Sequence, residues 1–387
     1  MAEKTKPESV GMSSSHMDVI DITLKEFIDS GKLAGMIALI ARRGKVVKFD
    51  CYGKLDVSAD KPVQADSLFR IASLTKPITS VGVLMLYEQG YFNLDDPVSK
   101  WIPSFKNFKV LPDVTNLESE PSNLEREITF RHLLTHTSGL GYGFDPDSTE
   151  PIERIYLDEK IISPFGLPQL SLPQMIDKVS NLPIAFQPGK TWKYSIAHDV
   201  LGYLISLISG KPFDVYLRER IFEPLGMQDT SFYVPPEKLE RFGPLYGTPN
   251  NDGLPEIDNV SDSPYVDPDV VPSGGAGLVS SMPDYFRFML MLANGGELDG
   301  TRYLKSETVN EMTTNQITGF SLEGVGYGLG IGVKVTDIQK FGWIGISGTS
   351  AWIFPRDEMI VISMTQASFF WDASSALQRI AYDAIMT

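Results

Sequence analysis

Residues 69–80, FRIASLTKPITS, place a serine and a lysine three positions apart, at Ser73 and Lys76. Residues at i and i+3 of a helix share one face, so this spacing sets the Lys76 ammonium beside the Ser73 hydroxyl. Pro77 is tolerated best in a first turn, which predicts a helix over residues 74–90. A serine hydroxyl becomes a nucleophile when a nearby base takes its proton. Ser73 is therefore a candidate nucleophile, and Lys76, or a tyrosine held near it, is a candidate base.

Strand patterns lie at both ends of the chain, and helical patterns lie between them. An apolar hairpin is predicted near the N-terminus, and three β-rich runs precede a last helix. These elements are residues 36–41 and 45–52 (hairpin), 327–335, 349–354 and 359–365 (strands), and 16–30 and 373–386 (helices). Strands from both termini favour a central antiparallel sheet flanked by helices, with an inserted, mostly helical lobe, which is an α+β fold.

This order of elements predicts two domains. We expect a discontinuous sheet domain of residues 1–85 and 275–387, and a mainly helical domain of residues 86–274. The active site would lie in the cleft between them. Residues 235–275 are rich in Pro, Asp, Asn and Gly, which is typical of an excursion over the surface.

Composition and charge exclude several classes of protein. The chain of 387 residues has 34 Lys and Arg against 49 Asp and Glu, and this net charge of −15 argues against binding to nucleic acid or to an anionic membrane. The single cysteine, Cys51, excludes an internal disulfide and any multi-thiolate metal site. The first residues lack the apolar core of a signal peptide, and no apolar run approaches the roughly 18 residues that span a bilayer. These features predict a cytoplasmic protein.

Four other segments have patterns that belong with the Ser73 stretch. They are ITFRHLLTHTSGLGY (128–142), FQPGKTWKYSIAHDVLG (186–202), EPLGM (223–227) and PSGGAGL (272–278). Together with FRIASLTKPITS they resemble the β-lactamase-like serine hydrolase superfamily, over about residues 7 to 386. The resemblance implies the β-lactamase/transpeptidase-like fold. It also makes Tyr194 the counterpart of the superfamily's motif tyrosine.

Three departures separate the chain from β-lactamases and penicillin-binding proteins. The third motif falls in residues 342–349, where Trp343-Ile344-Gly345 stands in place of Lys-Thr-Gly, so the cation that helps to bind a β-lactam carboxylate is missing. Ile196 stands where those enzymes carry an asparagine, and it cannot make that hydrogen bond. The missing secretion signal is the third departure. The Trp-x-Gly form is similar to the Trp-Gly-Gly of family VIII carboxylesterases.

The resemblance implies acyl transfer through a covalent intermediate on Ser73. Tyr194, as a phenolate or through Lys76, would accept the serine proton. Tyrosine has a reference pKa of about 10, so such a base needs the cation that Lys76 supplies. The backbone N–H groups of Ser73 and Ile346 would form the oxyanion hole. The residues expected to bind substrate are Trp343, Gly345 and Tyr142, the last near the mouth of the cleft.

Several further residues have patterns that are typical of other sites. His132 and His136 have H-x-x-x-H spacing, but position 133 is leucine and no third ligand is evident, so we expect structural roles and no metal. His198 is expected at the helix surface or behind the catalytic residues rather than as a triad base. Phe369-Phe370-Trp371 is expected in the core or in the cleft wall, where it would help to bind an acyl chain. The glycine string 326–332 predicts a strand near the cleft.

The sequence thus predicts a serine carboxylesterase that hydrolyses small to medium esters and uses no cofactor. An acyltransferase with an alcohol acceptor, and a weak β-lactamase or D-amino-acid peptidase, are alternatives that keep the same nucleophile. A non-catalytic ligand-binding relative does not need Ser73, Lys76 and Tyr194 together, which argues against it. The expected partner is a small-molecule ester, with neither nucleic acid nor membrane, and the oligomeric state stays open.

Overall fold

An eight-stranded antiparallel sheet forms the centre of the computed structural model, which describes residues 4–112, 120–251, 253–319, 325–334 and 338–386. The strand order is β12-β13-β14-β15-β16-β1-β2-β3. These strands are Gly35–Arg42 (β1), Lys45–Asp56 (β2), Lys61–Pro62 (β3), Val325–Tyr327 (β12), Gly332–Lys334 (β13), Lys340–Ile344 (β14), Ser350–Phe354 (β15) and Met359–Thr365 (β16). Strand β1 pairs with both β2 and β16, so the N-terminal and C-terminal strands join in one sheet as predicted.

Strand β1 shows why the sheet has helices on both faces. All eight of its residues are buried. Successive side chains of a strand point to opposite faces. Accordingly, Ile37, Leu39 and Ala41 belong to one hydrophobic cluster. The alternate residues Met36, Ala38 and Ile40 belong to another. A strand that is apolar at every position has to be covered on both sides.

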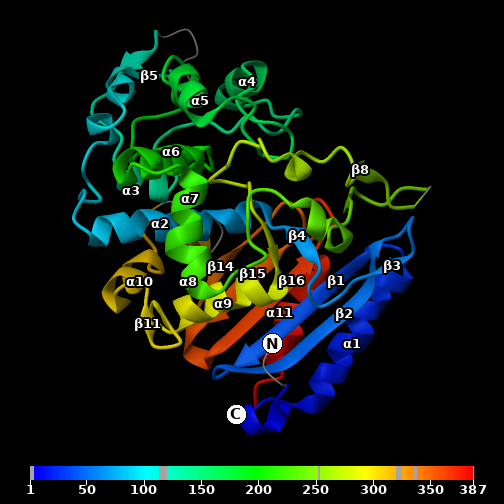
Figure 1. The fold of residues 1–387 in the computed structure, drawn as a ribbon. Coiled ribbons are helices and arrows are strands. Elements are labelled where there is room, and N and C mark those ends of the chain that lie inside the picture. The colour runs from blue at the N-terminus through cyan, green and yellow to red at the C-terminus, as the bar shows by residue number, and fades with distance from the viewer. Residues whose placement is uncertain (1–3, 113–119, 252, 320–324, 335–337, 387) are drawn as a thin grey trace.

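Helices from the two ends of the chain cover one face of the sheet. They are Ser14–Asp29 (α1) and Asp372–Asp383 (α11), which pack against each other in Figure 1. The two ends of the chain lie close together at the bottom of Figure 1. There the Ser13 amide donates to Ala384 O at 2.9 Å, and the Met386 amide donates to Gly11 O at 2.9 Å. The opposite face is covered by Thr75–Glu88 (α2) and Met282–Ala293 (α9), whose Met289 and Met291 are buried in the same hydrophobic cluster as Ile37 and Leu39 of β1.

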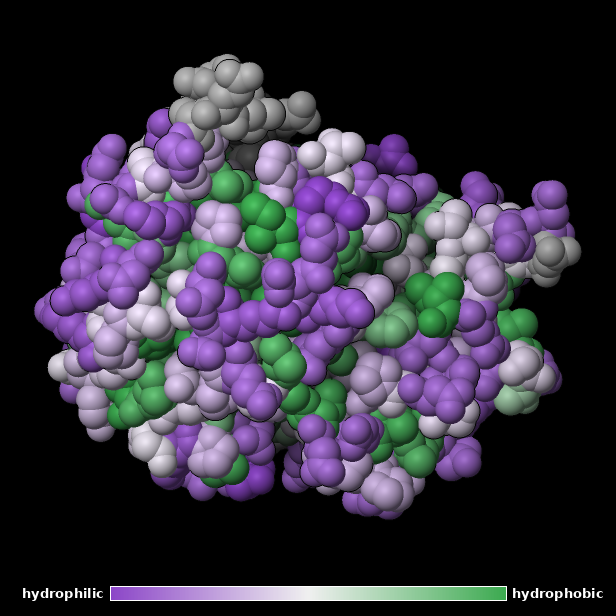
Figure 2. Space-filling view, turned by 90° about the horizontal axis from the view of Figure 1, so that it is seen from above, coloured by the Kyte–Doolittle hydropathy of each residue, from purple (hydrophilic) through white to green (hydrophobic). Residues whose placement is uncertain are grey.

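The remaining helices lie mainly between residues 130 and 225. They are Phe130–Leu134 (α3), Pro151–Asp158 (α4), Leu172–Val179 (α5), Ala197–Ser209 (α6), Phe213–Leu217 (α7) and Glu223–Leu225 (α8), with Ser306–Met312 (α10) later in the chain. In Figure 1 helices α3 to α6 form a group above the sheet, on the far side of α2. Figure 2 looks down on the molecule from this side, where hydrophilic residues cover most of the face and hydrophobic residues show between them. Among the described residues, no helix combines the length and the apolar character needed to cross a membrane.

In the described ranges, four short strand pairs accompany the central sheet. They are Leu68–Arg70 (β4) with Val279–Ser281 (β9), Lys109–Val110 (β5) with Ser122–Asn123 (β6), Leu245–Tyr246 (β7) with Glu256–Asp258 (β8), and Glu297–Leu298 (β10) with Thr301–Arg302 (β11). The β4–β9 pair matters most for the site. It brings the residues just before Ser73 against the segment that follows residue 272.

Two expectations about elements need correction. The predicted strand 327–335 is a hairpin of β12 and β13, because the chain turns back at Gly330, whose φ of 78° is left-handed; Val335 lies outside the described residues. The segment 235–275 is also more than a surface excursion. It buries Phe242 and Tyr265, and its Asp258 accepts a hydrogen bond from the fully buried Arg70 at 2.7 Å.

Candidate active site

Ser73 lies at a sharp turn between β4 and α2. The pairing of β4 with β9 ends at Arg70, and the Ile71 amide donates to Leu278 O at 3.0 Å. Ala72 then has a φ of 44°, a left-handed conformation that is uncommon for a residue with a β-carbon. Such strain persists only where the surroundings hold it, and it is frequent at functional sites. The turn leaves Ser73 at the wall of a pocket.

Lys76 lies beside Ser73 at the spacing that the sequence suggested. Its side chain is completely buried. The ammonium Nζ donates to Ser73 Oγ at 3.2 Å and to the backbone oxygen of Gly275 at 2.8 Å. Helix α2 begins at Thr75, one residue later than predicted, after a 3-10 turn over Ala72–Leu74. The 3-10 turn and the first turn of α2 therefore deliver the nucleophile candidate and a buried cation to the same point.

Tyr194 reaches the same point from the segment just before α6. Its ring centre lies 4.4 Å from Lys76 Nζ. The indole Nε1 of Trp343, on β14, donates to the Tyr194 hydroxyl at 3.1 Å. Tyr142 stacks on Tyr194 with ring centres 5.5 Å apart and an angle of 19° between the planes. A helix, a loop and a strand that are far apart in sequence thus converge on one phenol.

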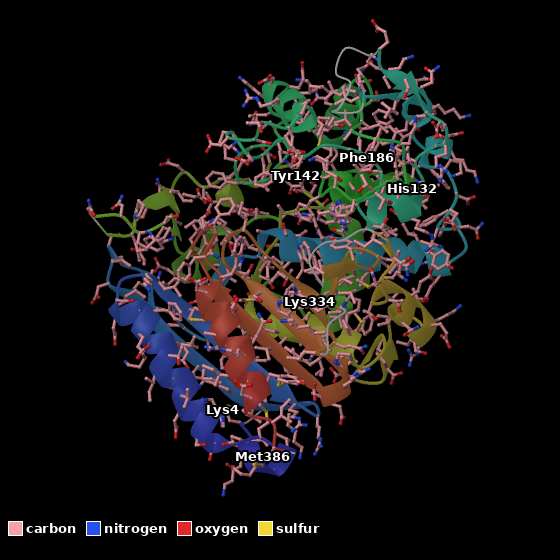
Figure 3. All side chains as sticks on the ribbon, turned by 180° about the vertical axis from the view of Figure 1, so that it is seen from behind. Lys4, His132, Tyr142, Phe186, Lys334 and Met386 are labelled. Carbon is pink, nitrogen blue, oxygen red and sulfur yellow. The ribbon has the colours of Figure 1, made fainter. Side chains whose placement is uncertain are left out.

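Tyr142 lies deeper than the sequence suggested. Its side chain is buried rather than at the mouth of the cleft, and Figure 3 shows it among the elements of the helical group. Burial, with the neighbouring Tyr194 as a second cause, holds the pKa of Tyr142 well above its ordinary value. Tyr142 therefore stays a neutral phenol at physiological pH. The backbone of this loop is fixed by Glu153, which accepts hydrogen bonds from the amides of Tyr142 at 3.2 Å and Gly143 at 2.8 Å.

Asp199 is a site residue that the sequence reading missed. It is buried in the first turn of α6, and its Oδ1 accepts hydrogen bonds from Ser273 Oγ at 2.6 Å and from the Gly275 amide at 3.3 Å. A β-carbon added to Gly275 would stand 2.9 Å from Asp199 Oδ2 and 3.5 Å from Lys76 Nζ. Burial raises the pKa of Asp199, while the Ser273 hydrogen bond and the charge of Lys76 oppose that rise. An acid in an otherwise apolar helix is the signal that marks it in the sequence.

His132 lies in the first turn of α3, where it completes a capping box with Thr129. His132 caps α3: its amide donates to Thr129 Oγ1 at 3.2 Å, and its Nδ1 accepts from the Thr129 amide at 3.2 Å. Burial lowers the pKa of His132 to about 4. Figure 3 shows His132 well away from Tyr142. Within the described residues, no three or more His, Cys, Asp or Glu side chains are grouped so that they could hold a metal ion.

His136 and His198 pack behind Tyr194. The His136 ring centre lies 4.7 Å from that of Tyr194 and 5.0 Å from that of His198. Both imidazoles are fully buried, so His198 is not at a helix surface, and its Nε2 lies 3.1 Å from Ser80 Oγ. Burial is the main cause that holds the pKa of each well below its ordinary value, and the charge of Lys76 adds to it. Both rings are therefore neutral.

The pocket beside Ser73 has a volume of about 190 Å³ and is lined by aromatic and aliphatic side chains. No charged side chain is among the described residues that line it. They are Ser73, Tyr142, Phe144, Pro164, Phe165, Gly166, Trp192, Tyr194, Ala276, Trp343, Ile344, Ile346, Phe369 and Trp371. The sequence reading did not find Phe144, Phe165 and Trp192, because nothing in their spacing distinguishes them from core aromatics.

Gly345, unlike the other residues expected to contact substrate, does not line the pocket. A β-carbon there would stand 2.3 Å from Thr349 Oγ1 and 2.5 Å from Ile71 O. A glycine is needed here so that the loop after β14 can approach the turn that carries Ser73. Ile346, the next residue, does line the pocket.

Comparison with known proteins places this site in a family. A beta-lactamase family model matches residues 20–384. Protein Rv1367c of Mycobacterium tuberculosis is 34% identical over 374 residues, which cover 91% of this chain and 90% of that protein. Esterase EstB of Burkholderia gladioli is 31% identical over 355 residues, which cover 86% of this chain and 83% of that protein.

Two solved structures have the same fold as this chain. EstCE1, described as a hydrolase with promiscuous acyltransferase activity, has a TM-score of 0.79 at 25% identity, covering 97% of this chain and 99% of that one. Simvastatin synthase (LovD) from Aspergillus terreus also has a TM-score of 0.79, at 22% identity, covering 96% of this chain and 98% of that one. The chain therefore belongs to the beta-lactamase family and has the β-lactamase/transpeptidase-like α+β fold.

Proposed function

We propose that the chain is a serine carboxylesterase that hydrolyses small to medium, uncharged esters through an acyl-enzyme on Ser73. The observation that carries this proposal is the buried Lys76 ammonium 3.2 Å from Ser73 Oγ, at the wall of an apolar pocket. A buried cation beside a hydroxyl favours the loss of its proton. The likeness to Esterase EstB supports an ester as the substrate.

Tyr194 is the residue to which we assign the role of proton acceptor. Lys76 donates to Ser73 Oγ and to the Gly275 oxygen, so the proton of Ser73 is left for another acceptor. The hydroxyl of Tyr194 receives the Trp343 indole N–H, which stabilises negative charge on the phenol oxygen. Tyr194 would take the proton as Ser73 attacks and return it to the departing alcohol. Water then attacks the acyl-enzyme and releases the acid.

The pocket argues for a neutral substrate. A β-lactam carries a carboxylate, and burial of an unpaired charge is costly. Trp343 occupies the wall where a cation would be needed, and none of the described lining residues is charged. The sequence alternative of β-lactamase or peptidase activity is therefore not the function that we propose.

The two-domain division is part of the proposal. Residues 142–194 supply one wall of the pocket, and Ser73 with residues 276–371 supplies the other. This is the arrangement expected for a cleft between a domain of residues 1–85 and 275–387 and a domain of residues 86–274. We also propose a cytoplasmic location, which fractionation of the source cells with an antibody would test.

A p-nitrophenyl butyrate assay tests the esterase proposal. The wild-type chain should turn over, and Ser73→Ala should lower kcat on the order of 10⁴-fold or more, because the acyl-enzyme cannot form. Ser206→Ala is the matched control, because that hydroxyl donates to Gly202 O of its own helix at 3.3 Å, away from the pocket lining, and it should keep the wild-type rate. An alkyl phosphonate should add its mass to the peptide that contains Ser73. Undiminished turnover by Ser73→Ala, or labelling at another residue, would refute the assignment.

Acyl transfer is the second function that an observation favours. The walls of the pocket are aromatic, so an apolar alcohol could bind there and compete with water for the acyl-enzyme. The description of EstCE1 as a hydrolase with acyltransferase activity agrees with this idea. Turnover in the presence of a primary alcohol, with ester and acid products measured separately, distinguishes transfer from hydrolysis.

A further inference from the structure

The loop after β14 presents one backbone amide beside Ser73. Ile346 lines the pocket, and its N–H donates to no acceptor within the described part of the chain. The oxygen of the same peptide group, Gly345 O, behaves in the opposite way. It accepts the Trp371 indole N–H at 2.9 Å and the Gly348 amide at 2.9 Å. One side of this peptide is thus fully bonded, and the other side is left for a ligand.

The geometry of a peptide group connects the two sides. In a trans peptide the C=O and the following N–H point in opposite directions. Trp371 Nε1 fixes where Gly345 O points, and therefore where the Ile346 N–H points. Hydrogen bonds along a chain also polarise one another, so donation to Gly345 O strengthens the Ile346 N–H as a donor. The effect is greater where the local dielectric constant is low.

A second contact holds the next peptide of the loop. The Phe369 amide donates to Ile346 O at 2.8 Å. Phe369 has a φ of 56° and a side chain that is 59% exposed, so burial of its ring does not explain this strained backbone. Residues 369–371, which the sequence reading assigned to the core or cleft wall, therefore brace residues 345 and 346 from two directions.

We propose that Trp371 is a positioning residue for the oxyanion hole: its indole N–H fixes the 345–346 peptide so that the Ile346 N–H meets the substrate oxygen. The proposal rests on the proposed esterase function. As Ser73 Oγ bonds to the ester carbon, the electron pair of the C=O moves onto the oxygen, and the serine proton passes to the base. The oxyanion accepts the Ile346 N–H until the C–O bond to the alcohol breaks. Trp371 itself never touches the reacting atoms in this role.

Trp371→Phe tests the proposal, because it keeps an aromatic wall and removes the N–H. We expect kcat for p-nitrophenyl butyrate to fall about 10-fold to 100-fold with KM changed less than about 2-fold, as for an interaction made only in the transition state. Inhibition by a trifluoromethyl ketone, which forms a tetrahedral adduct with Ser73, should weaken by the same factor. Phe369→Leu is the control, since it changes the side chain in the wall and leaves its amide in place; it should alter KM more than kcat.

One further variant keeps the result decisive. Incorporation of β-(3-benzothienyl)alanine at position 371 replaces the indole N–H by sulfur at nearly constant shape, and it should reproduce the Trp371→Phe loss. A wild-type kcat in this variant, or a loss confined to KM, would overturn the role of Trp371. Two other outcomes would instead overturn the esterase function on which the role depends. They are a wild-type protein that hydrolyses none of the esters, and a Ser73→Ala variant that keeps the wild-type rate.

Discussion

At the scale of single residues, the central question is how the fold encloses the charge of Lys76. The side chain is fully buried, and it forms no ion pair within 4 Å in the part of the chain that the structure describes. Asp199 Oδ2 and Lys76 Nζ both lie against the α-carbon of Gly275, where a β-carbon would come within 2.9 and 3.5 Å of them. Removal of one member of a buried pair of charges is far more costly than removal of both. We therefore infer that Asp199, whose carboxyl pKa the charge of Lys76 lowers against the effect of burial, is the counter-charge of the buried ammonium.

Asp199→Asn should therefore lower kcat/KM for a neutral ester by about 10-fold or more. The amide oxygen can still accept from Ser273, so the local hydrogen bonds survive while the counter-charge is lost. Ester hydrolysis measured across pH 5 to 9 checks this, with thermal unfolding to show that the variant folds. Asp158→Asn, which removes an exposed carboxylate on α4, is the control. A variant with the wild-type rate at every pH would contradict the role of Asp199.

The contrast between these residues shows what local spacing can reveal. Ser73, in the 3-10 turn, and Lys76, in the first turn of α2, are three positions apart, so their contact follows from local helical geometry. Asp199 meets Gly275, and Trp371 meets Gly345, only because loops from distant parts of the chain come together. Hydrogen bonds of that kind depend on the tertiary structure. An acid in a mainly apolar helix marks Asp199 as unusual, but the sequence pattern does not show which distant residues such hydrogen bonds join.

At the scale of elements, α9 begins with a buried acid that ties two segments together. Asp284 Oδ2 accepts hydrogen bonds from the Asp229 amide at 2.6 Å and from Thr230 Oγ1 at 2.9 Å. Burial is the main cause that raises the pKa of Asp284 to about 6. An acid at the first turn of a helix is favoured by the helix dipole, but here the loss of hydration outweighs that benefit.

The direction of this pKa predicts how stability changes with pH. The native protein holds the Asp284 proton more tightly than the unfolded chain does, so the stabilisation is complete below pH 4 and is lost as the pH rises to about 6. A pKa that rises from 3.8 to about 6 corresponds to about 3 kcal/mol. Asp284→Asn keeps an acceptor and carries no charge. Urea unfolding at pH 4 and pH 7 measures the free energy of unfolding of the variant and the wild type. Relative to the wild type, the variant should be more stable at pH 7 than at pH 4 by about that amount. A difference between the two proteins that is the same at both pH values would refute the prediction.

The elements also show where local patterns stop being informative. The hairpin of β1 and β2 could be predicted because apolar runs flank Arg43-Gly44, and both residues have the positive φ of a turn. The sequence of residues 327–335 resembles a strand as closely as those two runs do, yet the chain turns at Gly330, which separates β12 from β13. Its amide donates to Leu134 O at 2.8 Å, so a contact with the helical part of the chain fixes that turn. No local pattern encodes a turn that is set by a partner almost 200 residues away.

At the scale of the whole molecule, a strongly acidic protein encloses an uncharged pocket. The net charge is −15, while the described lining of the pocket contains no charged side chain. Ion pairs such as those of Arg70 with Asp258 hold the fold together and do not face the pocket. The summed charge of a protein acts on approaching ligands over the range of the Debye length. An anionic ester therefore meets repulsion before it reaches a pocket that has no cation to receive it.

Salt should separate charged from neutral substrates on this basis. The matched pair is mono-p-nitrophenyl succinate, which carries a carboxylate, and its methyl ester, which does not. As the Debye length shortens from about 30 Å at 0.01 M to about 8 Å at 0.15 M, kcat/KM for the anion should rise at least about threefold. The rate for the methyl ester should stay constant and exceed that of the anion at both salt concentrations, because its uncharged end enters the apolar pocket without loss of a charged group's hydration. If the anion is hydrolysed as fast as its methyl ester at low salt, a cation in the site must bind the carboxylate. That result would favour β-lactams and related anionic compounds as substrates.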